Sequence, residues 1–211
     1  LPPDELFAAI AGTSMSSPHV AGLFALIKQA HPDWSAAMAK SALMTTAYQE
    51  VVDNDRISQA VPFAMGSGHV DIGNAVHKGS AFQPGLAYDA GLFEYAAYTC
   101  GENFGIFSPN DCAFLESLGV PFEAYNLNVP SIGIAELAGS QTVVRTLTSV
   151  DSAKGWRNYR VDVDAPPGYE VEVSPSRFRL RSGQSASYTV TFDNVSAPLD
   201  EWRFGTLTWH D

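Results

Sequence analysis

Apolar residues recur at helical spacing in two segments near the start of the chain, 14–30 and 35–47. The first segment is apolar on nearly every side, which predicts a helix buried inside a domain. Ser35 stands at the start of the second segment and suits the N-cap of its helix. An apolar run at residues 6–10 predicts a short buried strand. The predicted order here is therefore strand, helix, helix.

Further along the chain, the apolar pattern changes from helical to alternating. Residues 92–119 carry two short helical patterns, and Ser108 caps the second. From about Asn126 onward apolar and polar residues alternate, as in the stretch 159–164. Seven such segments, separated by Pro, Gly and Ser turns, are expected between Val129 and the end. This pattern predicts a β-sandwich in which each sheet has one face in water.

The charge of the chain excludes some classes of partner. The 211 residues include 23 acidic and 12 basic side chains, which gives a net charge of −11. Such a protein repels polyanions at long range, so no nucleic-acid partner is expected. No apolar run approaches about 18 residues, so no membrane span is expected. The chain begins at Leu1 without a signal-peptide pattern, and we expect a fragment or a processed chain.

Two features of the sequence resemble metal sites without meeting their requirements. Cys100 and Cys112 are 12 positions apart and have no His or Cys companions at zinc spacing. A disulfide in an oxidising compartment is the favoured interpretation, and two free buried thiols are the alternative. The acidic run 53–55 starts like a calcium loop but lacks the following Gly and the distant Glu. We predict a solvated turn there and no metal site in this chain.

The most informative stretch of the sequence is GTSMSSPHVAG at residues 12–22. A glycine turn places Ser14 at the head of an apolar helix, where the first backbone N–H groups lack intrahelical partners and the helix dipole is positive. An oxyanion formed beside Ser14 would be stabilised there. Serine also needs a base within hydrogen-bond reach to become a nucleophile. The alternative is that Ser14 is an ordinary N-cap.

The stretch resembles the nucleophile motif of the subtilisin-like serine proteases, and segments 31–35 and 41–47 resemble the helix that follows it in that family. Further segments resemble the cucumisin-like branch of the family: 66–71, 84–89, 127–132, 165–168, 173–176 and 204–209. The resemblance implies an α/β fold in residues 1–90, the C-terminal part of a catalytic domain with a parallel sheet. A helical connecting segment at 91–125 and a fibronectin-III-like sandwich at 126–211 follow.

The resemblance also implies an activity and a site. Ser14 would be the nucleophile, and its backbone N–H one donor of the oxyanion hole. The catalytic Asp and His and the oxyanion Asn would precede Leu1, so the isolated chain is expected to be inactive. The implied substrate is a protein or peptide, the upstream part of the catalytic domain is the implied partner, and the implied location is extracellular. No cofactor is expected in this chain, while the parent protein could bind calcium. The alternative function is a non-catalytic binding or structural sandwich joined to a remnant of a protease.

None of the histidines is expected to act as the base for Ser14. His19 lies five positions further along the same helix and points well round from Ser14, with no carboxylate spaced to orient it. His31 and His69 lie in predicted turns with solvated or packing roles. His77 and His210 have no companions and are expected at the surface.

Two further patterns leave alternatives open. Trp156, Trp202 and Trp209 could form a carbohydrate platform, but core or edge packing is the commoner role at strand spacing. The arginines at 177, 179 and 181 form a polar strand face that could also dock against an acidic catalytic domain. We also expect residues 1–90 to be ordered only when upstream strands or another copy of the chain cover the apolar helix.

Overall fold

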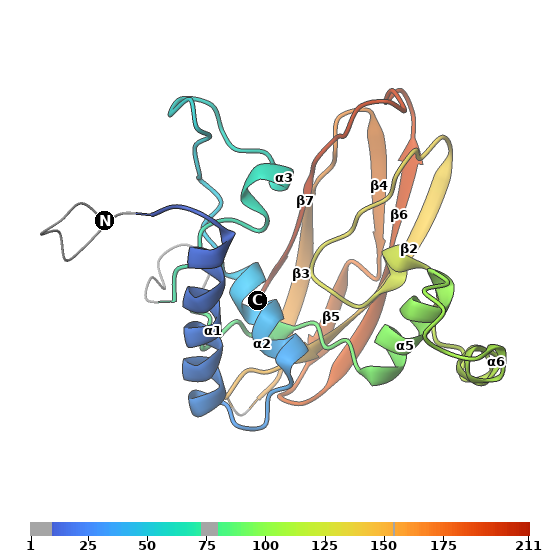
Figure 1. Ribbon diagram of the computed structural model, residues 1–211, viewed down its shortest axis with the longest axis horizontal. Helices are drawn as coiled ribbons and strands as arrows, with labels where there is room; N and C mark the ends of the chain where they lie inside the picture. The colour runs from blue at the N-terminus through green and yellow to red at the C-terminus, as the bar shows by residue number, and fades with distance from the viewer. Residues whose placement is uncertain (1–9, 73–79, 154) are drawn as a thin grey trace, which may run out of the picture.

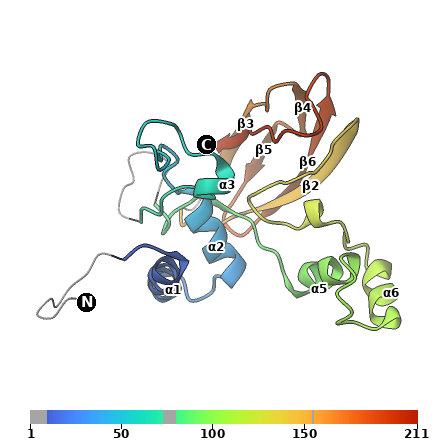
Figure 2. The same cartoon turned by 45° about the horizontal axis from the view of Figure 1, so that its top comes forward.

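The computed structural model describes residues 10–72, 80–153 and 155–211. The helices are α1 (Thr13–Ala30), α2 (Ala36–Thr45), α3 (Pro62–Met65), α5 (Leu92–Gly101), α6 (Pro109–Ser117) and the 3₁₀ turn η1 (Ala124–Asn126). The strands are β1 (Leu86–Ala87), β2 (Ser140–Ser149), β3 (Arg157–Asp164), β4 (Tyr169–Ser174), β5 (Arg177–Leu180), β6 (Ser185–Asn194) and β7 (Thr206–His210). The strand expected at 6–10 lies outside the described residues except for Ile10. Helices α1 and α5–α6 lie on opposite sides of α2 (Figures 1 and 2).

The strands form two antiparallel sheets that pack face to face. One sheet has the order β1-β2-β6-β4 and the other has the order β5-β3-β7. Their inner faces share a buried core, to which Tyr159, Leu180, Tyr188 and Val190 contribute. The alternation in the sequence therefore identified the sandwich and its inward-facing residues. Every strand pairing in the described residues is antiparallel, so the expected parallel sheet is not among them.

The expectation of seven strands after Val129 is wrong for the described residues. Six strands lie in that region, and the seventh strand of the two sheets is β1, which pairs Leu86 with Ser149 at one end of β2. The rest of that edge of β2 is paired with side chains. Asn126 Oδ1 accepts from the N–H of Val144, and the Asn128 amide bonds to the N–H and C=O of Thr146, all at 2.9–3.0 Å. These amides take the hydrogen bonds that a strand backbone would take.

Helices α1 and α2 pack against each other through small and apolar side chains. Ser35 caps α2, because its Oγ accepts from the N–H of Met38 at 2.9 Å. The shared cluster consists of Ile27, Trp34, Ala39, Ala42, Leu43 and Ala81. Ile27 is therefore covered by the chain itself. Val20 and Leu26 are 37% and 47% exposed, so α1 is not buried all round in the described structure.

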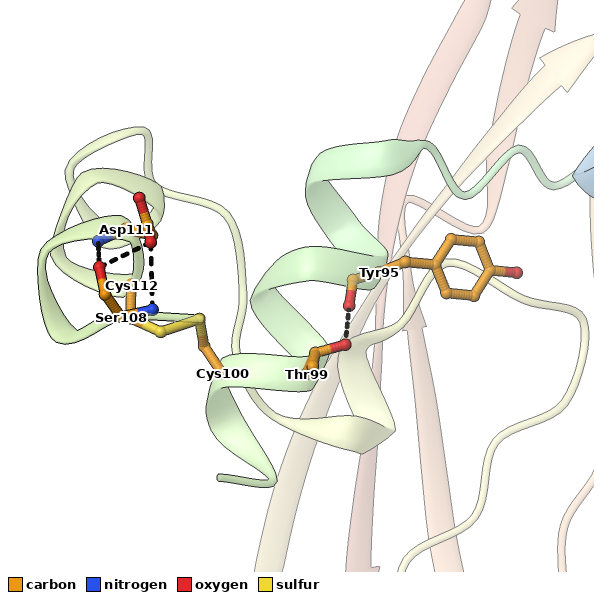
Figure 3. Close-up of a disulfide and its surroundings, with 6 residues drawn as sticks. All are labelled: Tyr95, Thr99, Cys100, Ser108, Asp111 and Cys112. Atoms are coloured by element: carbon orange, nitrogen blue, oxygen red, sulfur yellow. Dashed lines mark hydrogen bonds between the residues drawn. A yellow bond between two sulfur atoms is a disulfide. The ribbon is translucent and has the colours of Figure 1, made fainter. Parts of the chain in front are cut away.

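The connecting segment is held by a covalent bond between its two helices. The sulfur atoms of Cys100 on α5 and Cys112 on α6 are bonded, with their Cα atoms 5.8 Å apart (Figure 3). Ser108 caps α6 as expected, and its Oγ accepts from the N–H of Asp111 at 3.3 Å. Within the described ranges, no helix is both long enough and apolar enough to cross a membrane.

Candidate nucleophile at the head of helix α1

The first turn of α1 is built on Gly12. Its φ of +155° is a conformation that favours glycine, and it turns the chain into the helix. The carbonyl oxygen of Gly12 accepts from the N–H groups of Met15 and Ser16 at 3.0 and 3.1 Å. The helix therefore begins at Thr13, and Ser14 is its second residue.

Ser14 lies at the positive end of an 18-residue helix and is exposed to solvent. In the part of the chain that the structure describes, its backbone N–H has no acceptor and its Oγ has no hydrogen-bond partner. The first turn of α1 contains no acidic side chain that would neutralise the dipole. The position therefore offers an oxygen nucleophile beside a backbone donor that is available to an anion.

His19 within α1 and His31 at the C-terminal end of α1 each have partners other than Ser14. His19 Nδ1 lies 2.5 Å from the carbonyl oxygen of Met15 on its own helix. His31 stacks on Trp34 with ring centroids 3.9 Å apart, and its Nε2 lies 2.8 Å from the carbonyl oxygen of Phe82. His31 thus has the packing role that its position in a turn predicted.

The remaining three histidines are His69, His77 and His210. His69 forms a backbone bridge with Tyr48. His210 is at the surface as predicted, but its Nε2 lies 3.2 Å from Asp162 Oδ2, so the expectation that it has no companion is wrong. The two residues belong to paired strands, β3 and β7, and strand pairing was not predicted from the sequence. His77 lies outside the described residues.

The acidic run at 53–55 forms a turn, as predicted. Asp55 Oδ1 accepts from the N–H groups of Ile57 and Ser58 at 2.8 Å, and its Oδ2 accepts from the hydroxyl of Ser58. These hydrogen bonds, the hydroxyl of Ser58 first, lower the pKa of Asp55. Among the described residues, no group of three His, Cys, Asp or Glu side chains could hold a metal ion.

The tryptophans divide between core and surface. Trp209 packs in the sandwich core, with its ring centroid 4.3 Å from that of Phe178. Trp202 is 53% exposed and meets the edge of Phe63, which lies in α3. Trp156 is 40% exposed and lies beside two arginines. Packing therefore accounts for Trp209 but leaves Trp156 open to another role.

A structural residue that the sequence analysis missed is Arg145 on β2. It is 2% exposed and donates to the carbonyl oxygens of Tyr125, Val129 and Ser131 at 2.8–3.0 Å. Burial lowers the pKa of Arg145. Arg145 is two residues after Val143 on the same strand, so both side chains lie on the same face. Because Val143 faces the core, the period-two pattern already places an arginine at an inward position. Arg145 fixes the start of the sandwich segment onto β2.

Comparison with known proteins identifies the class to which this arrangement belongs. Residues 1–68 match the family model described as "Subtilase family", and residues 126–211 match the one described as "Fibronectin type-III domain". Residues 1–68 therefore belong to the subtilase family, and residues 126–211 form the fibronectin-III-like domain that the sequence resemblance implied.

The relatives agree with this assignment over almost the whole chain. Subtilisin-like protease SBT2.6 of Arabidopsis thaliana is 35% identical over 97% of this chain and 26% of its own length. Subtilisin-like protease SBT5.5 of the same plant is 38% identical over 95% of this chain and 25% of its own length. The CO(2)-response secreted protease of Arabidopsis thaliana is 33% identical over 98% and 28%. The chain thus spans about a quarter of the length of these curated relatives.

Proposed function

We propose that the protein containing this chain is a serine endopeptidase and that Ser14 is its nucleophile. The observation that carries the proposal is the placement of Ser14 as the exposed second residue of α1, with its backbone N–H unpaired among the described residues. The subtilase match over residues 1–68 includes this turn and helix.

The reaction follows from this placement. Ser14 Oγ attacks the carbonyl carbon of a peptide bond while a histidine takes the hydroxyl proton. The carbonyl oxygen becomes an oxyanion, to which the N–H of Ser14 donates a hydrogen bond at the positive end of α1. The amine leaves with the proton from the histidine, and water then hydrolyses the acyl-serine ester.

The other parts of this machinery are assigned to the rest of the protease. We infer that the catalytic Asp and His and the oxyanion Asn lie before Leu1. We also infer that a parallel sheet there covers the exposed face of α1 and that calcium, if used, binds there. The 1–90, 91–125 and 126–211 division remains our proposal for the domains. The name of the secreted relative supports secretion of this protein, and the disulfide is compatible with it.

Substitution of Ser14 in the whole protease tests the proposal. Ser14→Ala should lower kcat/KM for peptide hydrolysis by about 10⁴–10⁶. Ser17→Ala is the matched control, since Ser17 is also exposed in the first turns of α1, and it should leave activity within about twofold. Retention of more than a few per cent of activity by Ser14→Ala would refute Ser14 as the nucleophile.

A further inference from the structure

The outer side of strands β3 and β5 carries a cluster of arginines around one tryptophan. We call it the basic face and define it by Trp156, Arg160, Arg177, Arg179 and Arg181. All five side chains belong to exposed residues. Arg177 lies directly opposite Arg160 in the ladder, and the intervening Phe178 points into the core. The alternation of the strands therefore gathers these charges on the solvent side of the sheet.

Trp156 fixes the position of two of the arginines. The guanidinium carbon of Arg179 lies 4.7 Å from the centroid of the Trp156 ring, and that of Arg181 lies 4.4 Å from it. A guanidinium stacked on an aromatic ring still has N–H donors available at its edge. Two donor forks are thus held close together before any ligand arrives, which reduces the entropy lost on binding.

Of the four arginines in the basic face, Arg160 pairs with Asp162, and the other three have no acidic partner among the described residues. The ion pairs of the described residues involve Arg157, Arg160, Arg203 and His210 but not the arginines at 177, 179 and 181. Arg177 also lies directly opposite Arg160, and like charges in this arrangement are unfavourable for a sheet. The chain as a whole has a net charge of −11, so this face is a local region of positive charge, and it is complementary to an anionic ligand.

We propose that the basic face binds an acidic polysaccharide, with the sugar carboxylates on the forks of Arg179 and Arg181. Guanidinium forks match carboxylates in a bidentate geometry. The hollow beside Arg181 is lined by Ser152, Ala153, Gly155 and Ser182, and its two serines offer hydroxyls for sugar hydroxyls.

The spacing of the basic face also fits a repeating ligand. Arg177 and Arg179 repeat at about 6.6 Å along β5, so a chain with a carboxylate on each sugar can meet several arginines at once. Nucleic acid is the poorer ligand, because duplex DNA carries a charge every ~1.7 Å, a much closer spacing than that of these arginines. The proposal does not depend on the role of Ser14.

Binding of the 211-residue chain to immobilised polygalacturonate tests the proposal. The double variant Arg179→Gln/Arg181→Gln should weaken binding at least about tenfold and reduce its salt dependence. The double variant Arg56→Gln/Arg203→Gln removes the same charge outside the basic face and should change binding less than about twofold. Thermal unfolding of both variants checks that they fold.

Several outcomes would overturn the proposal. They are no binding to polygalacturonate at low salt, equal weakening by the two double variants, and tighter binding to polyglutamate than to polygalacturonate. The last result would identify an acidic protein as the ligand. Neutral galactan should not bind, and binding to it with unchanged affinity would also contradict a carboxylate-dependent site.

Discussion

The hydroxyl oxygens of Tyr88 and Tyr188 lie 2.6 Å apart in the buried centre of the molecule. Tyr188 belongs to β6 of the sandwich, whereas Tyr88 follows β1 and donates its backbone N–H to the Ser41 hydroxyl on α2 at 2.9 Å. Tyr88 thus connects α2, the helix that follows α1 in the chain, to the core of the fibronectin-III-like domain. The two parts of the chain therefore share a polar contact as well as a strand.

Removal of the hydroxyl of Tyr188 should lower the stability of the 211-residue chain. Tyr188→Phe leaves the buried hydroxyl of Tyr88 without this partner, which costs about 1–3 kcal/mol in the free energy of unfolding. Urea unfolding followed by tryptophan fluorescence measures the change. Tyr169→Phe, at a half-buried tyrosine on β4, should cost less than about 0.5 kcal/mol. Equal losses in the two variants would show that the tyrosine pair contributes nothing specific.

The same tyrosine pair should make the chain sensitive to alkali. Burial, followed by the proximity of Tyr188, raises the pKa of Tyr88, and burial also raises the pKa of Tyr188. The folded state then keeps protons that the unfolded state releases above about pH 10. Stability should therefore fall as pH rises beyond that value. Urea midpoints between about pH 8 and about pH 11 test this prediction, and Tyr188→Phe should show a shallower fall. Equal pH slopes for the two proteins would contradict it.

Arg145 should be irreplaceable even by lysine. An ammonium group cannot reach the separate carbonyl oxygens of Val129, Tyr125 and Ser131 that the guanidinium fork bonds. Arg145→Lys should cost about 1–3 kcal/mol for each buried carbonyl left unpaired. The exposed Arg160→Lys is the control and should be nearly neutral. Thermal or urea unfolding compares the two, and a neutral Arg145→Lys would show that the fork is unimportant.

The bond between Cys100 and Cys112 should stabilise the α5–α6 segment. Closing a loop of this length contributes about 2–3 kcal/mol in the chain-entropy account. Cys100→Ala/Cys112→Ala should increase hydrogen exchange in α5 and α6 and leave the sandwich strands protected. Reduction of the native chain should have the same effect, whereas the double variant should not respond to a reductant. Unchanged exchange in α6 after both treatments would contradict this role.

The sequence predicted the sandwich well because its signal is local. Alternation at Tyr159 and Tyr188 gave both the strands and the direction of their side chains. The cap residues Ser35 and Ser108 marked helix starts for the same reason. Strand pairing was beyond reach, because β1 joins β2 from more than 50 residues away. The side-chain amides of Asn126 and Asn128 pair with β2 in place of a neighbouring strand, and such pairing produces no alternating pattern in the sequence.

The candidate site was predictable as a motif but not as a surface. The sequence of residues 12–22 was sufficient to select Ser14. The apolar pattern of α1 indicated that other residues must cover it, but not that Ile27 packs within this chain while Val20 and Leu26 stay exposed. Similarly, Arg145 occupies an inward position in an alternating strand, yet the carbonyl groups that bind it come from residues 125–131.

Labelling with a fluorophosphonate probe tests the central claim most directly. In the whole protease, mass spectrometry should locate the phosphonate on Ser14, and Ser14→Ala should abolish the label. In the 211-residue chain alone, labelling should be slower by about 10⁴ or more, because the base that activates Ser14 is supplied by the rest of the protease. A label on another residue of the whole protease, or equally fast labelling of the isolated chain, would contradict the account.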